Sequence, residues 1–273
     1  MERIKEAVEK ARAGQSAGIN VGRKNIEVPA FSRGQPSADL ESITYTQTRV
    51  VSLDPRHLEA NRIIAANKND ARAMAFDILR TKILGAMGTN QWKTIAITSP
   101  RPDCGKSIVA INLAISLARQ TDHTVLLADF DLRRPRLGAY LGLPQEDALV
   151  ECIEGRRELK DALINPGIPR LVVLTNSSGM THASELLSSQ KVKDLVMELR
   201  QRYERRILIF DLPPVLTADD TMAFLPQVDC ALLVVASGAT TKSEVEESER
   251  LLTSTNLLGV VLNKAEDYQQ PYY

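Results

Sequence analysis

The sequence lacks an excess of either charge, a long apolar run and any paired cysteine motif. Lysines and arginines together number 34, as do aspartates and glutamates, which argues against a nucleic-acid-binding or acidic-membrane-binding protein. No apolar run approaches the roughly 20 residues that cross a bilayer, and no signal-peptide pattern opens the chain. We therefore expect a cytoplasmic protein with no membrane span of its own, whose membrane location would depend on a partner.

Cysteine is scarce as well. Cys104, Cys152 and Cys230 are isolated, so the spacing typical of a metal site is missing and the pattern suits a reducing compartment. Apolar residues, in contrast, make up 44% of 273 residues, which is enough to bury the core of one large α/β domain with an appendage.

Three regions are predicted along the chain. Residues 1–49 combine a short charged helix, Met1–Arg12, with a flexible linker rich in glycine, serine, proline and charge. Residues 50–264 form the folded domain, and residues 265–273 form a polar tail that contains tyrosines.

The folded domain opens with a predicted helical lead-in over Val50–Ala66 and Ala71–Met87. From Trp92 onward, short apolar runs alternate with amphipathic stretches such as Lys191–Tyr203 and Ser243–Thr253. The apolar runs are Thr94–Thr98, Thr124–Ala128, Leu171–Leu174, Ile207–Phe210, Ala231–Ala236 and Gly259–Leu262. This alternation predicts an α/β fold with a mostly parallel sheet and helices on both faces, and ligands bind such sheets at the carboxyl ends of the strands.

One strand end leads into a candidate phosphate-binding loop. The loop ends in Gly105-Lys106-Ser107, and an apolar helix follows. In such loops, N–H groups at the helix start bind an anion, the lysine reaches the β/γ-phosphates and the serine faces Mg²⁺. Pro100 replaces the first glycine of the usual pattern. The alternative is an ordinary strand-to-helix turn with a surface lysine.

Two further strands end in carboxylates. Asp129 and Asp131 follow one apolar run, and in an extended segment their side chains would project to the same side. Asp211 ends another strand, directly before a Pro-Pro pair. A hard cation that bridges phosphates prefers such oxygen ligands, although aspartate also ends many strands without any function. Three such acids beside a phosphate-binding loop favour metal-dependent nucleotide chemistry.

These segments resemble a known family. Ser99–Ser107, Ala128–Pro135 and Ile209–Val215 are similar to the Walker A, A′ and B motifs of the bacterial tyrosine kinases that regulate exopolysaccharide biosynthesis and export. The similarity covers roughly residues 50–264, and the lead-in is most similar to the stand-alone autokinases associated with exosortase loci. The resemblance implies a P-loop NTPase-like fold.

The resemblance also implies roles for individual residues in the transfer of the ATP γ-phosphoryl group to tyrosine. Lys106 would contact the β/γ-phosphates, while Asp129 and Asp131 would help hold the water shell of Mg²⁺ and activate the tyrosine hydroxyl. Asn263 would lie near the adenine. The implied metal ligands are Ser107, Asp129 and Asp211. The implied nucleotide-binding residues are Arg101, Pro102, Asp103, Cys104, Gly105, Lys106, Ser107, Ile108 and Asn263.

The family also suggests acceptors and partners. Tyr268, Tyr272 and Tyr273 crowd the tail, and relatives phosphorylate such clusters, usually on a neighbouring subunit; the alternative is a solvated end with chance aromatics. The resemblance implies a homo-oligomer and a partner in the cytoplasmic part of an inner-membrane polysaccharide co-polymerase.

Several residues depart from the family pattern. Asp103 stands at a usual glycine, where its carboxylate either opposes the phosphates or caps the helix. Arg101 either complements phosphate or lies in solvent. The family's ring-forming E-x-x-R-x-x-R reads Met74, Asp77 and Arg80, which puts assembly by that route in doubt.

Two more positions leave alternatives open. Leu212 follows the Walker B aspartate where a hydroxyl is usual, and the pair Arg133-Arg134 either touches phosphate or a tyrosine partner or forms a solvated turn. Besides an autokinase, the sequence therefore allows a partition-type ATPase switch without kinase activity, or a degenerate nucleotide-binding scaffold.

Overall fold

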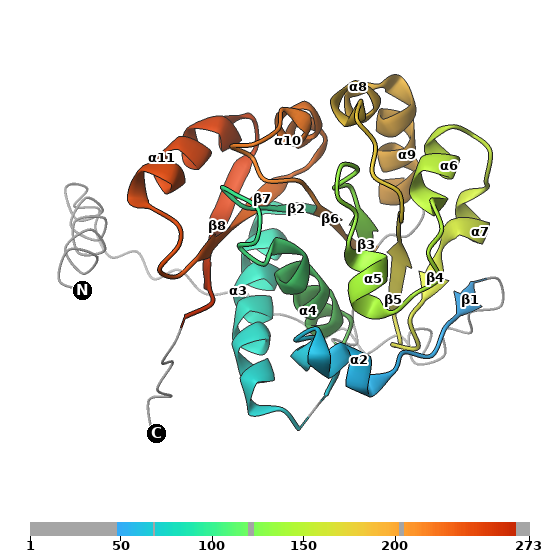
Figure 1. The fold of residues 1–273 in the computed structure, drawn as a ribbon, viewed down its shortest axis with the longest axis horizontal. Helices are drawn as coiled ribbons and strands as arrows, with labels where there is room; N and C mark the ends of the chain where they lie inside the picture. The colour runs from blue at the N-terminus through green and yellow to red at the C-terminus, as the bar shows by residue number, and fades with distance from the viewer. Residues whose placement is uncertain (1–47, 68, 120–122, 202–204, 266–273) are drawn as a thin grey trace, which may run out of the picture. The chain divides into compact units, whose positions relative to one another are not determined.

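A mostly parallel sheet forms the centre of the structure, a computed structural model that describes residues 48–67, 69–119, 123–201 and 205–265 (Figure 1). In sheet order the strands are β1 (Arg49–Val50), β4 (Ile164–Asn165), β5 (Leu171–Leu174), β3 (Thr124–Asp129), β6 (Arg206–Asp211), β2 (Thr94–Thr98), β7 (Cys230–Ala236) and β8 (Asn256–Asn263). Every neighbouring pair is parallel except β4 and β5. The predicted N-terminal helix and the tail tyrosines lie outside the described residues.

Helices cover both faces of this sheet, as the alternation of apolar runs predicts. One face carries α2 (Pro55–Ala60), α3 (Met74–Asn90), α4 (Lys106–Ala118) and α5 (Leu137–Leu141). The other carries α6 (Ala148–Ile153), α7 (Leu159–Ala162), α8 (Ala183–Ser188), α9 (Gln190–Gln201), α10 (Asp220–Phe224) and α11 (Lys242–Leu251). Within β2, Ile95 and Ile97 pack into the first layer and Ala96 into the second, since successive side chains of a strand point to opposite faces. No helix among these residues is long and apolar enough to cross a bilayer.

A cluster of three aromatic rings fixes the acidic strand ends. Phe130 lies 5.0 Å from Phe210 and 4.6 Å from Phe224 between ring centroids, and all three are fully buried. Phe130 separates Asp129 from Asp131 in the chain, and Phe210 directly precedes Asp211. Burying these rings against one another therefore holds the ends of β3 and β6 together.

The predicted helical lead-in over Val50–Ala66 is only partly correct. Val50 belongs to β1, which pairs with β4, and α2 begins only at Pro55, where the Asp54 side chain accepts a hydrogen bond from the backbone N–H of Arg56 at 2.9 Å. A proline at the first helical position and an aspartate cap define this start. The helix predicted over Ala71–Met87 is confirmed as a short 3-10 turn followed by α3.

One prediction concerns Asp147, the N-cap residue of α6, whose side chain binds the loop after β5. Asp147 is partly buried, which raises the pKa of its carboxyl, but the N–H groups of Ser178 and Ser177 outweigh this and lower the pKa to about 2. The side chain accepts hydrogen bonds from Ser178 N at 2.7 Å and Ser177 N at 2.9 Å. We expect Asp147→Asn to lower the free energy of unfolding by about 1 kcal/mol at pH 7, since solvent screens part of the interaction.

The direction of this pKa shift determines how the stabilisation depends on pH. Because the folded-state pKa is depressed, the stabilisation is present above the unfolded value of 3.8 and is lost as the pH falls towards 2. Urea unfolding between pH 2 and pH 7 should show the two proteins converging at the acid end. A constant difference across this range would contradict the assignment.

Candidate functional site

The loop between β2 and α4 has the backbone geometry of an anion cradle. Gly105 is the N-cap of α4 with φ +89°, and no side chain caps the helix, so its first N–H groups face the loop. Asn263, at the end of β8, donates through Nδ2 to the Cys104 carbonyl at 2.9 Å. A Cβ on Gly105 would lie 2.2 Å from that Nδ2, so a larger residue would displace the Asn263 side chain as well as strain the backbone at this positive φ.

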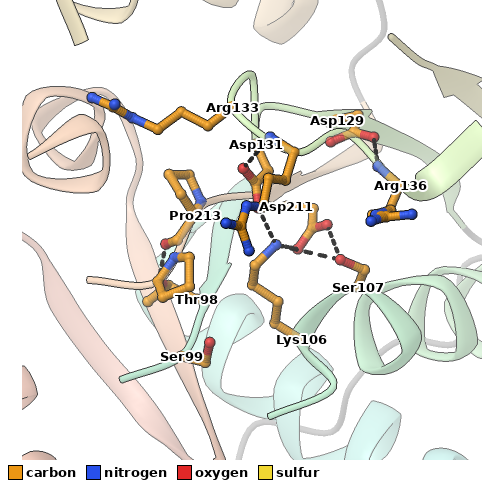
Figure 2. Close-up of polar contacts among 12 residues, drawn as sticks. Thr98, Ser99, Lys106, Ser107, Asp129, Asp131, Arg133, Arg136, Asp211 and Pro213 are labelled. Carbon is orange, nitrogen blue, oxygen red and sulfur yellow. Dashed lines mark hydrogen bonds and ion pairs between the residues drawn. The ribbon is translucent and has the colours of Figure 1, made fainter. Parts of the chain in front are cut away.

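Lys106 lies among buried acids at the start of α4. Its Nζ is 2.7 Å from Asp131 Oδ2 and 3.4 Å from Asp211 Oδ1 (Figure 2). Ser107 Oγ donates to Asp211 Oδ2 at 2.5 Å. The structure therefore brings together the lysine, the serine and two of the predicted acids, from α4, from β6 and from the loop after β3.

Asp129 belongs to the same cluster but contacts different partners. Its Oδ2 accepts hydrogen bonds from the backbone N–H groups of Arg136 and Leu137, both at 2.9 Å. The carboxylate thus fixes the turn that carries residues 130–136. Although Asp129 and Asp131 are two residues apart, only Asp131 forms an ion pair with Lys106.

The charges in this cluster do not balance. Burial raises the pKa of Asp129 well above its usual value, and the negative charge of Asp211 adds to the effect. Burial also raises the pKa of Asp211, although Lys106 and Ser107 act against it. For Lys106, burial would lower the pKa, but Asp211 and Asp131 outweigh it and raise the pKa, so the ammonium stays charged. Three acids near one lysine repel one another, and this repulsion adds to burial in raising the pKa values of Asp129 and Asp211.

This donor set fits a hard divalent cation. Asp129 Oδ1 is buried without a hydrogen-bond partner, and Ser107 offers a hydroxyl oxygen. Among the described residues, however, no group of three or more histidine, cysteine, aspartate or glutamate side chains converges to hold a metal by itself. A magnesium ion would therefore complete its shell with water and phosphate oxygens, as it usually does.

A cavity of about 710 Å³ opens beside these residues. Its wall includes the phosphate-binding loop, the turn after β3, the Pro-Pro turn after β6 and Lys264 after β8. Arg136, Tyr140 and Lys264 are lining residues that the sequence prediction missed. For Arg136, the sequence did offer a signal, because arginines cluster in residues 133–136, directly after Asp129 and Asp131.

Two positions in the loop resolve the alternatives that the sequence leaves open. Asp103 is exposed with φ +63°, and the N-cap of α4 is Gly105, so the expectation that Asp103 caps the helix is wrong. The positive φ explains why glycine is usual at this position. Arg101 is exposed to solvent, as one of the two alternatives predicts, and it forms an ion pair with Glu244 on α11 instead of lining the cavity.

Two other departures have a structural explanation. Leu212 is fully buried in the core layer that holds the helices α6 to α11, so its side chain is a core residue and not a lost neighbour of the metal site. Arg80 donates to Asp77 at 2.5 Å and to Ser116 Oγ at 3.0 Å, so its guanidinium is engaged within the domain. Tyr268, Tyr272 and Tyr273 lie outside the described residues.

A second prediction follows from Asp103, a residue that lines the cavity. We expect Asp103→Gly to tighten ATP binding by about fivefold, because it removes a negative charge near the phosphates and suits the positive φ. Isothermal titration calorimetry at two salt concentrations measures this. Unchanged or weaker affinity would mean that the carboxylate does not face the phosphates.

The chain is similar to several characterised proteins. Residues 95–271 match the family model of the CobQ/CobB/MinD/ParA nucleotide binding domain. The putative tyrosine-protein kinase CapB of Staphylococcus aureus is 31% identical over 198 residues, which are 71% of this chain and 86% of CapB. The tyrosine-protein kinase Ptk of Acinetobacter johnsonii is 32% identical over 72% of this chain, which spans only 26% of Ptk. The kinase domain of the Escherichia coli tyrosine kinase ETK has a TM-score of 0.68 at 30% identity and covers 77% of this chain and 82% of that domain.

Proposed function

Because the chain belongs to the bacterial tyrosine-protein kinases, within the CobQ/CobB/MinD/ParA nucleotide-binding family, we propose that it transfers the γ-phosphoryl group of ATP to tyrosine. The observation that carries the proposal is the position of Lys106. Its ammonium lies at the start of α4, beside the cradle, and is held 2.7 Å from Asp131 and 3.4 Å from Asp211.

The residues of this site have distinct roles in the proposed reaction. The N–H groups at the start of α4 and Lys106 bind the phosphates, and Asn263 supports the loop through the Cys104 carbonyl. Mg²⁺, held by Ser107, Asp129 and Asp211, would neutralise charge that develops on the phosphates. Catalysis of this kind rests mostly on positioning and charge neutralisation.

Asp131 is the acid best placed to take the tyrosine proton. It lines the cavity, whereas Asp129 is fully buried and bound to backbone amides. Phosphates that bind Lys106 would compete with its ion pair to Asp131 and release that carboxylate. The freed carboxylate could then accept the proton of an incoming hydroxyl.

The acceptors and the biological setting complete the proposal. We propose that Tyr268, Tyr272 and Tyr273 are the phosphorylated residues, on a neighbouring copy in a homo-oligomer. We propose a cytoplasmic protein that regulates exopolysaccharide synthesis and reaches the inner membrane through the cytoplasmic part of a polysaccharide co-polymerase. The family resemblance supports this setting.

One experiment separates kinase, ATPase switch and scaffold. The purified full chain and a Lys106→Met control are incubated with ATP and Mg²⁺, and phosphate is located by mass spectrometry. Phosphate on the tail tyrosines that is absent from the control is the expected result. Phosphate release with unmodified tyrosines would instead indicate an ATPase switch, and nucleotide binding with neither reaction would indicate a scaffold.

A further inference from the structure

Cations gather at the rim of the cavity that contains Lys106. Arg134, Arg136 and Lys264 are exposed and line this cavity. Within the described part of the chain, none of the three forms an ion pair with a carboxylate. They come from two distant segments, the turn after β3 and the end of β8, which meet at this cavity.

The neighbouring Arg133 shows that an ion pair is available on this turn. Its guanidinium donates to Asp220 through Nε at 2.5 Å and through Nη2 at 3.1 Å, and it lies 3.6 Å from Asp219. Arg133 is therefore committed to α10 and holds the turn in place, while Arg134 and Arg136 remain available to a ligand.

The acids at this cavity do not neutralise these cations. Asp131 is paired with Lys106, and Asp103 on the phosphate-binding loop is the other carboxylate among the lining residues. In the proposed reaction, Lys106 and the N–H groups of α4 bind the phosphates. The exposed cations thus form a further group of positive charges at the rim of the cavity.

We propose that Arg134, Arg136 and Lys264 select a tyrosine that acidic residues immediately precede in its peptide. This inference rests on the proposed kinase function and names its substrate class. The chain carries such a sequence itself, in Glu266-Asp267-Tyr268. Arginines bind carboxylates through paired, charge-assisted hydrogen bonds, which give both affinity and orientation to the peptide.

The test uses the full chain with Tyr268→Phe, Tyr272→Phe and Tyr273→Phe, so that added peptide is the only tail acceptor. The acidic probe is the peptide of residues 264–273 with Tyr272→Phe and Tyr273→Phe; the neutral probe also carries Glu266→Gln and Asp267→Asn. We expect the KM of the acidic peptide to be about tenfold lower, since one charge-assisted pair contributes about that factor.

Variants of the rim separate recognition from a structural role. Arg134→Gln with Arg136→Gln should remove the difference between the peptides and leave the KM of ATP unchanged. Arg134→Glu with Arg136→Glu should instead favour a peptide with Glu266→Lys and Asp267→Lys. Arg72→Gln, an exposed arginine outside the cavity, is the matched control and should preserve the preference.

The outcomes are distinguishable. Equal KM values for the two peptides would overturn this inference and leave the kinase function standing. A raised KM of ATP in the glutamine variant would assign these arginines to the nucleotide and also overturn it. If neither peptide is phosphorylated while ATP is consumed, the proposed function and the inference both fail.

Discussion

Replacing Lys106 by methionine will reduce tyrosine phosphorylation by at least about a hundredfold, since removing one preorganised charge or donor at a reacting centre costs that much or more. The ammonium is the cation that the site directs at the cradle, and methionine keeps the length of the side chain without its charge. Phosphotyrosine immunoblots and mass spectrometry of the tail, at saturating ATP and Mg²⁺, measure the effect.

The same substitution leaves Asp131 and Asp211 without their counter-ion. Loss of one partner of a buried ion pair costs about 3–5 kcal/mol, so the variant will also unfold at lower urea concentration. A double variant, Lys106→Met with Asp131→Asn, removes one stranded carboxylate and should recover part of this stability without any activity. A single variant that keeps phosphorylation within tenfold of wild type would contradict the role of Lys106.

Asp211→Asn should separate activity from stability. The asparagine keeps the shape of the side chain and can still accept the Ser107 hydrogen bond, which spans 2.5 Å in the wild type. It removes the buried charge with which Asp211 would hold the proposed Mg²⁺. We expect at least about a hundredfold loss of transfer. The free energy of unfolding of the nucleotide-free protein should change by no more than about 1 kcal/mol, because Asp131 remains as the counter-ion of Lys106, 2.7 Å away.

Asp229→Asn is the matched control for this variant. Asp229 accepts hydrogen bonds from Lys93 N at 2.8 Å and Thr94 N at 2.9 Å, at the opposite end of β2 from the phosphate-binding loop. This control should lower stability and retain transfer. If Asp229→Asn and Asp211→Asn lose activity in proportion to their loss of stability, Asp211 has no specific role in the reaction.

The fold was largely predictable because its strands are buried on both faces. Such strands appear as continuous apolar runs, and the predicted Thr94–Thr98 and Leu171–Leu174 match β2 and β5. The edge strand β1 and its neighbour β4 were missed, since two residues each carry no periodic signal and their pairing depends on the rest of the sheet.

The candidate site was predictable in its chemistry but not in its contacts. The sequence places Lys106, Asp131 and Asp211 at strand and helix ends, and the parallel topology brings them together. It does not show that Leu212 packs into the core or that Arg101 pairs with Glu244, because both depend on elements far away in the chain. The rim formed by Arg134, Arg136 and Lys264 likewise exists only once β3 and β8 lie in one sheet.

A crystal structure with Mg²⁺ and a non-hydrolysable ATP analogue tests the central claim most directly. The account predicts that Lys106 Nζ moves from Asp131 to the β/γ-phosphate oxygens. It also predicts that Ser107 Oγ binds the Mg²⁺ ion and that Asp129 and Asp211 lie within the coordination shell of this ion. A nucleotide bound elsewhere, or a triphosphate in the cavity with Lys106 still paired to Asp131, would contradict it.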